Sequence, residues 1–421
     1  MDKLIIEGGH PLRGEISISG AKNASLALMP ASLLTNGTSV FRNTPELNDV
    51  YTMIKIMKHL GAEVNFQDRV ISIDTSVLTS MEAPYELVKK MRASFYVLGP
   101  LLARYGYAKV SLPGGCAWGP RPINLHLEGL KKLGAEIELD AGYIIARSKK
   151  LSGAKINFDK SSVGATGNVL MAAVLAKGTT VINNAAMEPE ITNLAQFLNK
   201  MGARISGVES PILTIEGVDE LKPAEIETIP DRIEAGTLMI AAAMTGGSVT
   251  FTNVSDNHLI AVLARLEDAG AKVLNNNGLI TVTSGGTDII PSDVSTSIFP
   301  GFPTDMQAHW IAYMTTAAGT STITDTIYLD RFAHVPEINR LGADITVKEN
   351  SAIVRGVPKL KGAKVMSTDL RASASLVLAG LIAEGQTEVL RVYHLDRGYE
   401  KLEAKLNSLG ARIQRVAGSE Y

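Results

Sequence analysis

The sequence is almost without cysteine: Cys116 is the only one in 421 residues. One cysteine excludes an internal disulfide and a cysteine-rich zinc site. The seven histidines show no metal-ligand spacing, and neither a GxxxxGK[ST] nor a GxGxxG element occurs. We therefore expect no metal, no cofactor and no nucleotide binding of those two types.

Long apolar runs and an excess of charge are also missing. No 18 apolar residues follow one another, and Met1–Glu7 has neither the apolar stretch nor the cleavage site of a signal peptide. The formal net charge of −2 gives no basic field to attract nucleic acid or anionic lipid. We expect a soluble cytoplasmic protein whose partners include neither nucleic acid nor a membrane.

The composition is that of a globular protein, with 45% hydrophobic and 20% charged residues. A chain of 421 residues is too long for one typical core, so two domains are the default expectation. An anionic ligand would need a local basic pocket, because the global charge is close to zero.

A repeat organises the chain. The pattern Gly-Ala-(charged)-Val/Ile begins at Gly61, Gly134, Gly202, Gly270, Gly342 and Gly410. The spacings are 73, 68, 68, 72 and 68 residues, which divide the chain into six units. Each Gly-Ala follows residues with apolar positions at helical spacing and precedes an alternating run, which predicts a helix, its C-cap and a strand.

Each unit has a second helix that is apolar on all sides and should be buried. The predicted ranges are 24–34, 95–103, 168–176, 236–244, 308–318 and 373–383. Six units favour two α/β domains of three units each, with threefold pseudo-symmetry; a solenoid is the alternative. We expect the first strand, Leu4–Ile6, to pair with the last units, and chain crossings near Ile18–Ala21 and Val218–Pro230.

Polar residues gather where these buried helices begin: Lys22-Asn23, Arg92, Ser162 with Thr166, Asp231-Arg232, Thr304-Asp305, and Asp369 with Arg371. Helix N-termini bind anions through free N–H groups, but cations there oppose the helix dipole. We interpret Lys22, Arg92 and Arg371 as functional. Lone Ser162 and Asp231 are more simply N-caps, and capping is also the plain alternative for Asp305.

Cys116 lies in the loop Ser111–Pro122, which has three glycines and three prolines and can be neither a helix nor a central strand. A free cysteine is usually a buried apolar residue. Here the loop favours exposure, and Arg121 would lower the thiol pKa. We expect proton donation or covalent addition to an electrophile.

Seven motifs in order resemble the UDP-N-acetylglucosamine enolpyruvyl transferase (1-carboxyvinyltransferase) family, of the EPSP synthase superfamily, from end to end. They span residues 20–24, 91–94, 112–122, 162–166, 301–308, 369–373 and 396–400. The resemblance implies an inverse α/β prism of six small α/β units in two domains, residues 1–21 with 230–421 and residues 22–229. It also implies an active site in the cleft between them, and no cofactor.

The implied reaction transfers the enolpyruvyl group of phosphoenolpyruvate to the 3′-hydroxyl of UDP-N-acetylglucosamine and releases phosphate, the first committed step of peptidoglycan synthesis. Cys116 matches the proton donor and site of covalent modification, and Asp305 the base. The other residues implied to be catalytic or to bind phosphoenolpyruvate are Lys22, Asn23, Arg121 and Arg397.

The resemblance also implies the nucleotide-sugar contacts: Asn23, Arg92, Arg121, Pro122, Ile123, Asn124, Leu125, Lys160, Ser162, Val163, Gly164, Thr304, Asp305 and Ile327. Supporting roles fall to Asp231, Arg331, Asp369 and Arg371. Asn124 stands where the family has Asp, and Tyr96 where some members have Trp. Both departures concern uracil contacts rather than the chemistry.

Two alternatives remain at this point. The first is the shikimate-pathway enolpyruvyl transferase, which needs no catalytic cysteine and has a different N-terminal motif. The second is a non-catalytic paralogue with a regulatory role, although the residues that the chemistry needs are all present.

Overall fold

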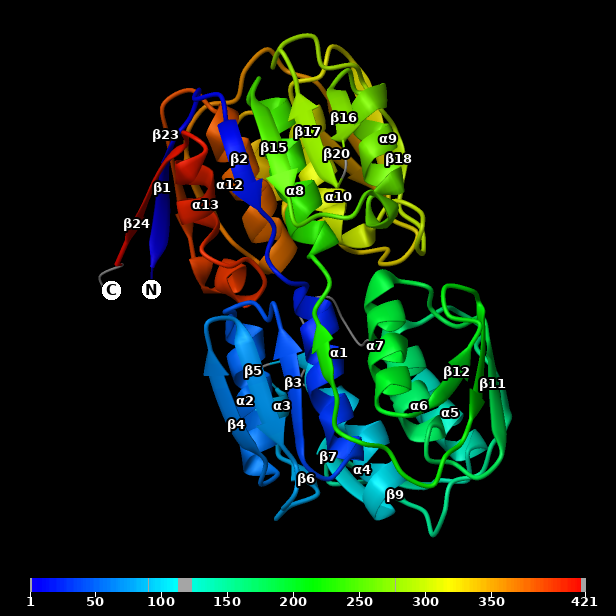
Figure 1. Ribbon diagram of the computed structural model, residues 1–421. Helices are drawn as coiled ribbons and strands as arrows, with labels where there is room; N and C mark the ends of the chain where they lie inside the picture. The colour runs from blue at the N-terminus through cyan, green and yellow to red at the C-terminus, as the bar shows by residue number, and fades with distance from the viewer. Residues whose placement is uncertain (1, 90, 113–122, 277, 418–421) are drawn as a thin grey trace. The chain divides into compact units, whose positions relative to one another are not determined.

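The computed structural model describes residues 2–89, 91–112, 123–276 and 278–417. The chain forms two compact units (Figure 1). Met1–Ser19 with Pro230–Tyr421 form the first, here called the terminal unit, and Gly20–Ile229 form the second, the central unit. No helix within the described ranges combines the length and apolarity needed to cross a bilayer.

The described residues form six four-stranded sheets of one design, three in each unit. In each sheet an edge strand runs parallel to its neighbour, and the other two pairings are antiparallel. The sheets of the central unit, in spatial order, are β14 (Glu225–Glu227), β3 (Thr38–Arg42), β5 (Val70–Asp74), β4 (Glu63–Gln67); β6 (Glu82–Ala83), β7 (Tyr107–Ser111), β9 (Tyr143–Arg147), β8 (Glu136–Asp140); and β10 (Lys155–Asn157), β11 (Thr179–Asn183), β13 (Ile212–Glu216), β12 (Arg204–Ser206). Those of the terminal unit are β16 (Lys272–Asn276), β17 (Leu279–Thr283), β15 (Ser248–Thr252), β2 (Arg13–Ser17); β18 (Val294–Ser295), β19 (Thr320–Thr324), β21 (Ser351–Arg355), β20 (Asp344–Lys348); and β22 (Lys364–Met366), β23 (Gln386–Leu390), β1 (Lys3–Glu7), β24 (Arg412–Val416).

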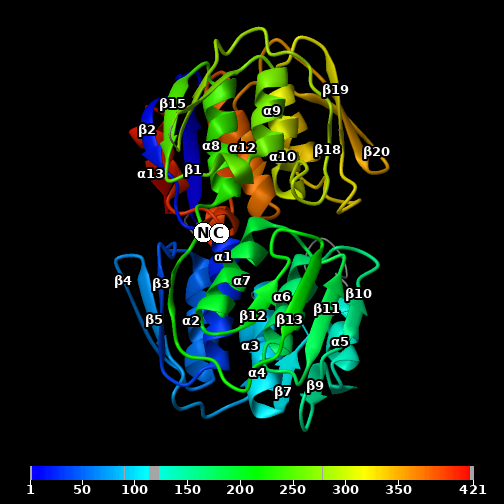
Figure 2. The ribbon, with the colours of Figure 1, turned by 45° about the vertical axis from the view of Figure 1, so that its right-hand side comes forward.

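The six predicted buried helices are all present, and in each unit three lie inside the sheets (Figure 2). They are α1 (Lys22–Ala31), α4 (Leu98–Tyr105), α6 (Val163–Ala173), α8 (Arg232–Met244), α10 (Gln307–Met314) and α12 (Leu370–Ile382). Two of them are preceded by 3₁₀ turns, η2 (Arg92–Val97) and η4 (Thr304–Met306). The apolar pattern locates these helices well, but α10 ends four residues earlier than the pattern predicts.

The outer helices confirm the meaning of the Gly-Ala repeat. They are α2 (Asn48–His59), α5 (Asn124–Lys132), α7 (Pro189–Lys200), α9 (Ile260–Asp268), α11 (Val335–Asn339) and α13 (Leu402–Ser408). Each is followed within three residues by the glycine of the repeat, and all six glycines have φ between +89° and +106°. Glycine adopts this left-handed conformation without strain, so the helix stops there and the next strand begins.

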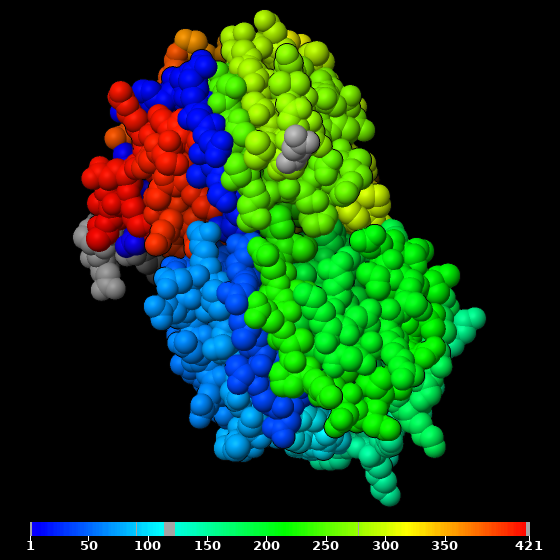
Figure 3. All heavy atoms as spheres, in the orientation of Figure 1, coloured from blue at the N-terminus to red at the C-terminus, as the bar shows by residue number. Residues whose placement is uncertain are grey.

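At each of the two points where the chain passes between the units, the last strand before the crossing pairs within the unit that the chain is leaving. β2 comes just before α1 but pairs with β15 of the terminal unit, and β14 comes just before α8 but pairs with β3 of the central unit. Figure 3 shows the N-terminal segment, in blue, at the surface beside the green residues of β15. Val218–Pro230, predicted as a crossing, is thus partly an edge strand of the central unit, whose last residue is Ile229.

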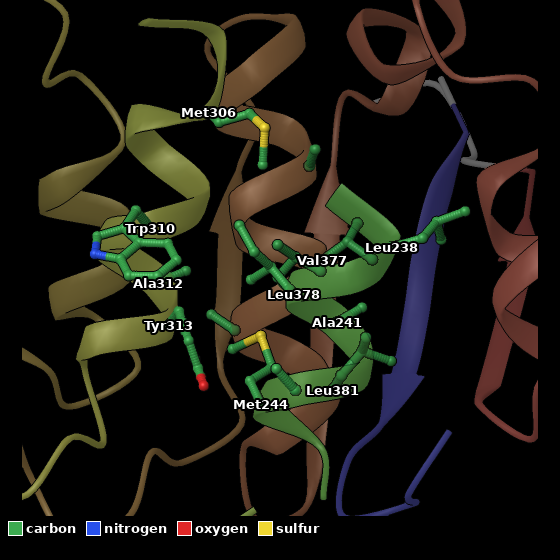
Figure 4. Close-up of a cluster of buried hydrophobic side chains, with 14 of the residues drawn as sticks. Leu238, Ala241, Met244, Met306, Trp310, Ala312, Tyr313, Val377, Leu378 and Leu381 are labelled. Carbon is green, nitrogen blue, oxygen red and sulfur yellow. The ribbon is translucent and has the colours of Figure 1, made fainter. Parts of the chain in front are cut away.

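The pairing predicted for the first strand is confirmed, since β1 lies between β23 and β24 (Figure 1). Each unit has its own apolar core. In the terminal unit Leu238, Trp310 and Leu378, which come from α8, α10 and α12, belong to one cluster of buried side chains (Figure 4). Burying each such side chain contributes about 1.5–3 kcal/mol, so the packed helices form a rigid base for whatever lies at their N-terminal ends.

Candidate active site

The polar residues predicted at the starts of the buried helices do lie there. In the terminal unit the centre of this group is Asp305, in the 3₁₀ turn before α10. Its Oδ1 accepts a hydrogen bond from Arg331 Nη1 at 2.8 Å, and its Oδ2 accepts from Arg371 Nε at 3.1 Å and Nη2 at 2.8 Å. Asp305 is therefore not an N-cap, which was its plainest alternative. It is a carboxylate fixed between two guanidinium groups.

Burial and charge act in opposite directions on these groups. The side chains of Arg331 and Arg371 are 7% and 4% exposed, whereas that of Asp305 is 27% exposed. Burial lowers the pKa of Arg371, but the attraction of Asp305, Tyr399 and Asp231, together with the hydrogen bond to Asp305, outweighs burial, and the net pKa is raised. Asp305 is therefore the member of the cluster that is most exposed to solvent, and the buried Arg331 and Arg371 hold a fixed positive charge beside its carboxylate.

A second buried carboxylate, Asp325, organises the neighbouring predicted contacts. It is fully buried, and its Oδ2 accepts from Thr304 Oγ1 at 2.7 Å while its Oδ1 accepts from the Ile327 backbone N–H at 2.9 Å. Arg331 Nη1 also donates to Thr304 Oγ1 at 3.1 Å. The structure thus brings Thr304, Asp305, Ile327 and Arg331 into one hydrogen-bonded group. Asp325 has no sequence signal of its own, because it follows a strand like many surface carboxylates.

The other two helix starts of the terminal unit are capped. Asp231 accepts from the N–H groups of Ile233 and Glu234 at 2.9 and 3.0 Å, and Asp369 accepts from those of Arg371 and Ala372 at 2.9 and 3.2 Å. The capping interpretation of Asp231 is confirmed. Asp369 fixes the backbone of Arg371, which in turn contacts Asp305.

Arg397 is partly exposed at the end of the 3₁₀ turn η5 (Val392–Arg397), and its neighbours are held firmly. Arg415 pairs with Asp396 through two hydrogen bonds of 2.6 and 3.0 Å. Glu400 accepts a hydrogen bond from Ser19 Oγ, which also contacts Lys405 Nζ at 2.7 Å. Arg397 therefore stands in a turn whose neighbouring residues are anchored on both sides.

In the central unit Lys22 is the first residue of α1, and its ammonium lies 3.5 Å from Asp49 Oδ2. Both side chains are nearly buried, at 11% and 5% exposed. Asn23 follows on the exposed side of the helix. No sequence pattern connects Asp49 with Lys22, because the carboxylate stands in the first turn of a different helix, α2.

The starts of α5, α6 and η2 meet around a buried histidine that the sequence did not single out. His126 Nδ1 lies 3.0 Å from Asn168 Nδ2, and Asn168 also bonds the backbone of Phe95 and Gly99. Burial, and then the charge of Arg92, lower the pKa of His126 to about 3, so it is neutral. A Cβ on Gly164 would come within 2.9 Å of this imidazole, so only glycine fits at that position.

The predicted nucleotide-sugar residues of the central unit flank this histidine. Asn124 and Leu125 begin α5, Val163 begins α6, and Ser162 caps α6 by accepting from Ala165 N–H at 3.3 Å. Ile123 directly precedes α5, Arg92 begins η2, and Lys160 is exposed.

Three predicted residues, Cys116, Arg121 and Pro122, lie outside the described residues. A strand and a helix flank these residues: β7 ends at Ser111 and α5 begins at Asn124. No group of three or more His, Cys, Asp or Glu within the described ranges is arranged to hold a metal ion.

Known proteins resemble this chain over its full length. The family model for EPSP synthase (3-phosphoshikimate 1-carboxyvinyltransferase) matches residues 6–406. A UDP-N-acetylglucosamine 1-carboxyvinyltransferase from Chloroherpeton thalassium is 59% identical, covering 100% of this chain and 99% of that protein. One from Chlorobium limicola is 56% identical, covering 100% of both.

Solved structures agree on the fold. The enolpyruvyl transferase NikO from Streptomyces tendae superposes with a TM-score of 0.90 at 24% identity, covering 99% of both chains. EPSP synthase from Acinetobacter baumannii gives 0.78 at 18% identity, covering 99% of this chain and 100% of that one. The predicted two-domain α/β fold of six small units is confirmed. By its full-length match at 54–59% identity to its curated relatives, this chain belongs to the UDP-N-acetylglucosamine 1-carboxyvinyltransferases within the EPSP synthase family of transferases.

Proposed function

We propose that this protein transfers the enolpyruvyl group of phosphoenolpyruvate to the 3′-hydroxyl of UDP-N-acetylglucosamine and releases phosphate. The observation that carries the proposal is the Asp305 cluster. Residues from three separated segments hold one reachable carboxylate at the position where the resemblance puts the base. The reaction supplies a precursor for peptidoglycan, and a reactive thiol at Cys116 suits the reducing cytoplasm.

Asp305 accepts the proton of the sugar 3′-hydroxyl in this proposal. Each carboxylate oxygen has two lone-pair sites, so Asp305 can accept a hydroxyl hydrogen bond in addition to those from Arg331 and Arg371. These two guanidinium groups fix the orientation of the carboxylate before the substrate arrives. Such preorganisation avoids a reorganisation cost during the reaction.

The steps balance as an addition followed by an elimination. The Cys116 thiol gives a proton to C3 of phosphoenolpyruvate, and the sugar oxygen bonds to C2 as Asp305 takes its proton. The resulting tetrahedral ketal then loses a proton from C3 to the Cys116 thiolate and the phosphate from C2, which restores the double bond; the departing phosphate takes the proton from Asp305, so both groups return to their starting states. We assign Lys22, Arg121 and Arg397 to the phosphate and carboxylate of phosphoenolpyruvate, whose negative charge they would stabilise.

The nucleotide-sugar is assigned to the helix starts around His126, together with the hydrogen-bonded group of Thr304, Asp305, Ile327 and Arg331. Helix N-termini bind phosphate groups through free N–H donors, and α5 and α6 both begin among these residues. Because the assigned residues belong to both units, we propose that the two units act on the same pair of substrates.

Phosphate release tests the proposal. We expect release with phosphoenolpyruvate and UDP-N-acetylglucosamine together, and none with either alone. Release with shikimate 3-phosphate in place of the nucleotide-sugar would identify the shikimate-pathway activity instead. No release with any combination at saturating substrate would leave a non-catalytic protein.

The thiol is tested separately. After incubation with phosphoenolpyruvate, mass spectrometry should find an adduct on the peptide that contains Cys116. Cys116→Ser should lose most turnover and labelling by fosfomycin, an epoxide mimic of phosphoenolpyruvate. Cys116→Asp should keep turnover but escape the epoxide, because a carboxylic acid can still donate a proton. Full activity and labelling in Cys116→Ser would refute this role.

A further inference from the structure

Tyr399 is a buried residue that the mechanism above does not use. It stands two residues after Arg397 and is 2% exposed, so it cannot meet a substrate directly. Its hydroxyl lies 2.9 Å from Thr237 Oγ1 of α8 and 2.9 Å from His309 Nε2 of α10. One phenol therefore connects two of the buried helices with the turn that carries Arg397.

The direction of these hydrogen bonds follows from counting protons. Burial lowers the pKa of His309 far below its usual value, so the ring is neutral and has one N–H. Nδ1 has no hydrogen-bond partner within the described residues, so we assign the proton to Nε2. Thr237 donates its own proton to the Ile233 carbonyl at 2.7 Å. His309 then donates to Tyr399, Tyr399 donates to Thr237, and every donor in the series is used.

The ring of Tyr399 contacts the active-site cluster. The Arg371 guanidinium carbon lies 5.4 Å from the ring centroid, within the range of a cation–π interaction. The edge of the same guanidinium donates two hydrogen bonds to Asp305. The hydroxyl series fixes the ring, the ring supports the face of Arg371, and Arg371 orients Asp305.

We propose that Tyr399 is a positioning residue for the transfer reaction, acting through Arg371 on Asp305 and through the backbone on Arg397. This inference rests on the proposed function and adds to it residues with no substrate contact: Tyr399, His309 and Thr237. The competing explanation is that Tyr399 only fills the core. The two explanations differ in what loss of the hydroxyl alone would do.

The test compares Tyr399→Phe with Tyr313→Phe. Tyr313 is fully buried in the same unit (Figure 4), and its hydroxyl has no hydrogen-bond partner among the described residues, so it is a matched control. We expect Tyr399→Phe to lower kcat about five- to tenfold and to change both KM values less than twofold, as a displaced but present catalytic group would. Tyr313→Phe should change kcat less than twofold. Equal kcat in both variants, per folded enzyme, would overturn the proposal.

A second pair of variants covers the case in which Tyr399→Phe folds poorly. His309→Gln can still donate from a similar position and should keep at least half of kcat. His309→Leu cannot donate and should lower kcat as Tyr399→Phe does. Equal kcat in His309→Gln and His309→Leu would contradict the proposed hydrogen bonds from His309 to Tyr399 and from Tyr399 to Thr237.

An activity-independent measurement separates this inference from the proposed function. If wild-type protein releases no phosphate with any acceptor, the proposed function fails. The shifts in thermal midpoint of Tyr399→Leu, which removes the ring, and Arg371→Met should still be non-additive in the double variant, because the ring–guanidinium contact links the two side chains. Additive shifts would show that Tyr399 does not hold Arg371, whatever the enzyme does.

Discussion

The two units differ in the charges that they place at equivalent helix starts. The buried helices of the terminal unit begin with the acids Asp231, Asp305 and Asp369. Those of the central unit begin with Lys22, Arg92 and the neutral cap Ser162, and none of these three starts has an acid in its first turn. The repeat is the same, but the terminal unit places an acid at every start, beside Arg232 and Arg371 at two of them, whereas two of the three starts in the central unit carry a cation that opposes the helix dipole.

The difference shows how one fold can divide two tasks. Asp231 and Asp369 cap α8 and α12, and Asp369 also fixes the backbone of Arg371, which contacts the proposed base Asp305. Cations at the starts in the central unit add to the positive end of each dipole, which costs stability but suits a ligand with phosphate groups. The following predictions test this division, beginning with the largest expected effect.

Removing the charge of Asp305 should have the largest effect. Asp305→Asn loses the proposed base and leaves Arg331 and Arg371 without their carboxylate, so kcat should fall on the order of 10³-fold. Asp268→Asn is a matched control, because its pair with Arg265 has the same 2.8 Å distance but is about half exposed. Steady-state phosphate release measures both. Wild-type turnover in Asp305→Asn would show that Asp305 is not the base.

Removing the charge of Lys22 should have the next largest effect. Lys22→Met should lower kcat/KM for phosphoenolpyruvate about 100-fold, since a charge-assisted hydrogen bond contributes up to about 3 kcal/mol. It also leaves Asp49 without this lysine. The double variant Lys22→Met/Asp49→Asn should recover thermal stability but not activity. Recovery of both would make Lys22 a structural residue only.

Acid should unfold the terminal unit before the central unit. Burial lowers the pKa of His334 to about 3 and that of His309 well below its usual value, whereas the central unit has one such histidine, His126. Each is neutral when folded and takes a proton near pH 6.5 when unfolded, so stability is lost as the pH falls from 6.5 toward 3. At pH 5 each costs about 2 kcal/mol.

Tryptophan fluorescence can follow this acid transition. In Trp118→Phe the remaining Trp310 reports on the terminal unit, and circular dichroism reports on both units. The fluorescence transition should come at the higher pH, and His334→Gln should reduce its steepness. A single coincident transition that His334→Gln leaves unchanged would contradict the assignment.

The helix caps should show the smallest difference. Asp231→Ala should destabilise the terminal unit by about 1 kcal/mol, and Ser162→Ala should destabilise the central unit by less. The reason is that Asp231 accepts two hydrogen bonds of 2.9 and 3.0 Å, whereas Ser162 accepts one of 3.3 Å. Asp231→Asn keeps a capping oxygen and serves as the control. Equal thermal shifts for the two alanine variants would contradict this ranking.

What the sequence predicts is local. The Gly-Ala repeat and the apolar helices are set by neighbouring residues, and the structure confirms them because glycine ends each outer helix at positive φ. The contacts of Asp305 are not local: Arg331 is 26 residues away and Arg371 is 66. Tyr399 meets His309 across 90 residues and Thr237 across 162. Such pairs depend on how the repeats pack against one another, and the residue spacing within one repeat does not predict that packing.

The position of β1 has a consequence for protein synthesis. It lies between β23 and β24, so its partners are residues 386–390 and 412–416, which the ribosome adds long after β1. All strands of the central unit lie between residues 38 and 227 and can pair while translation continues. β1 is thus made before every strand of the central unit but can pair only after them, and until then its hydrogen-bonding edges are open to other chains.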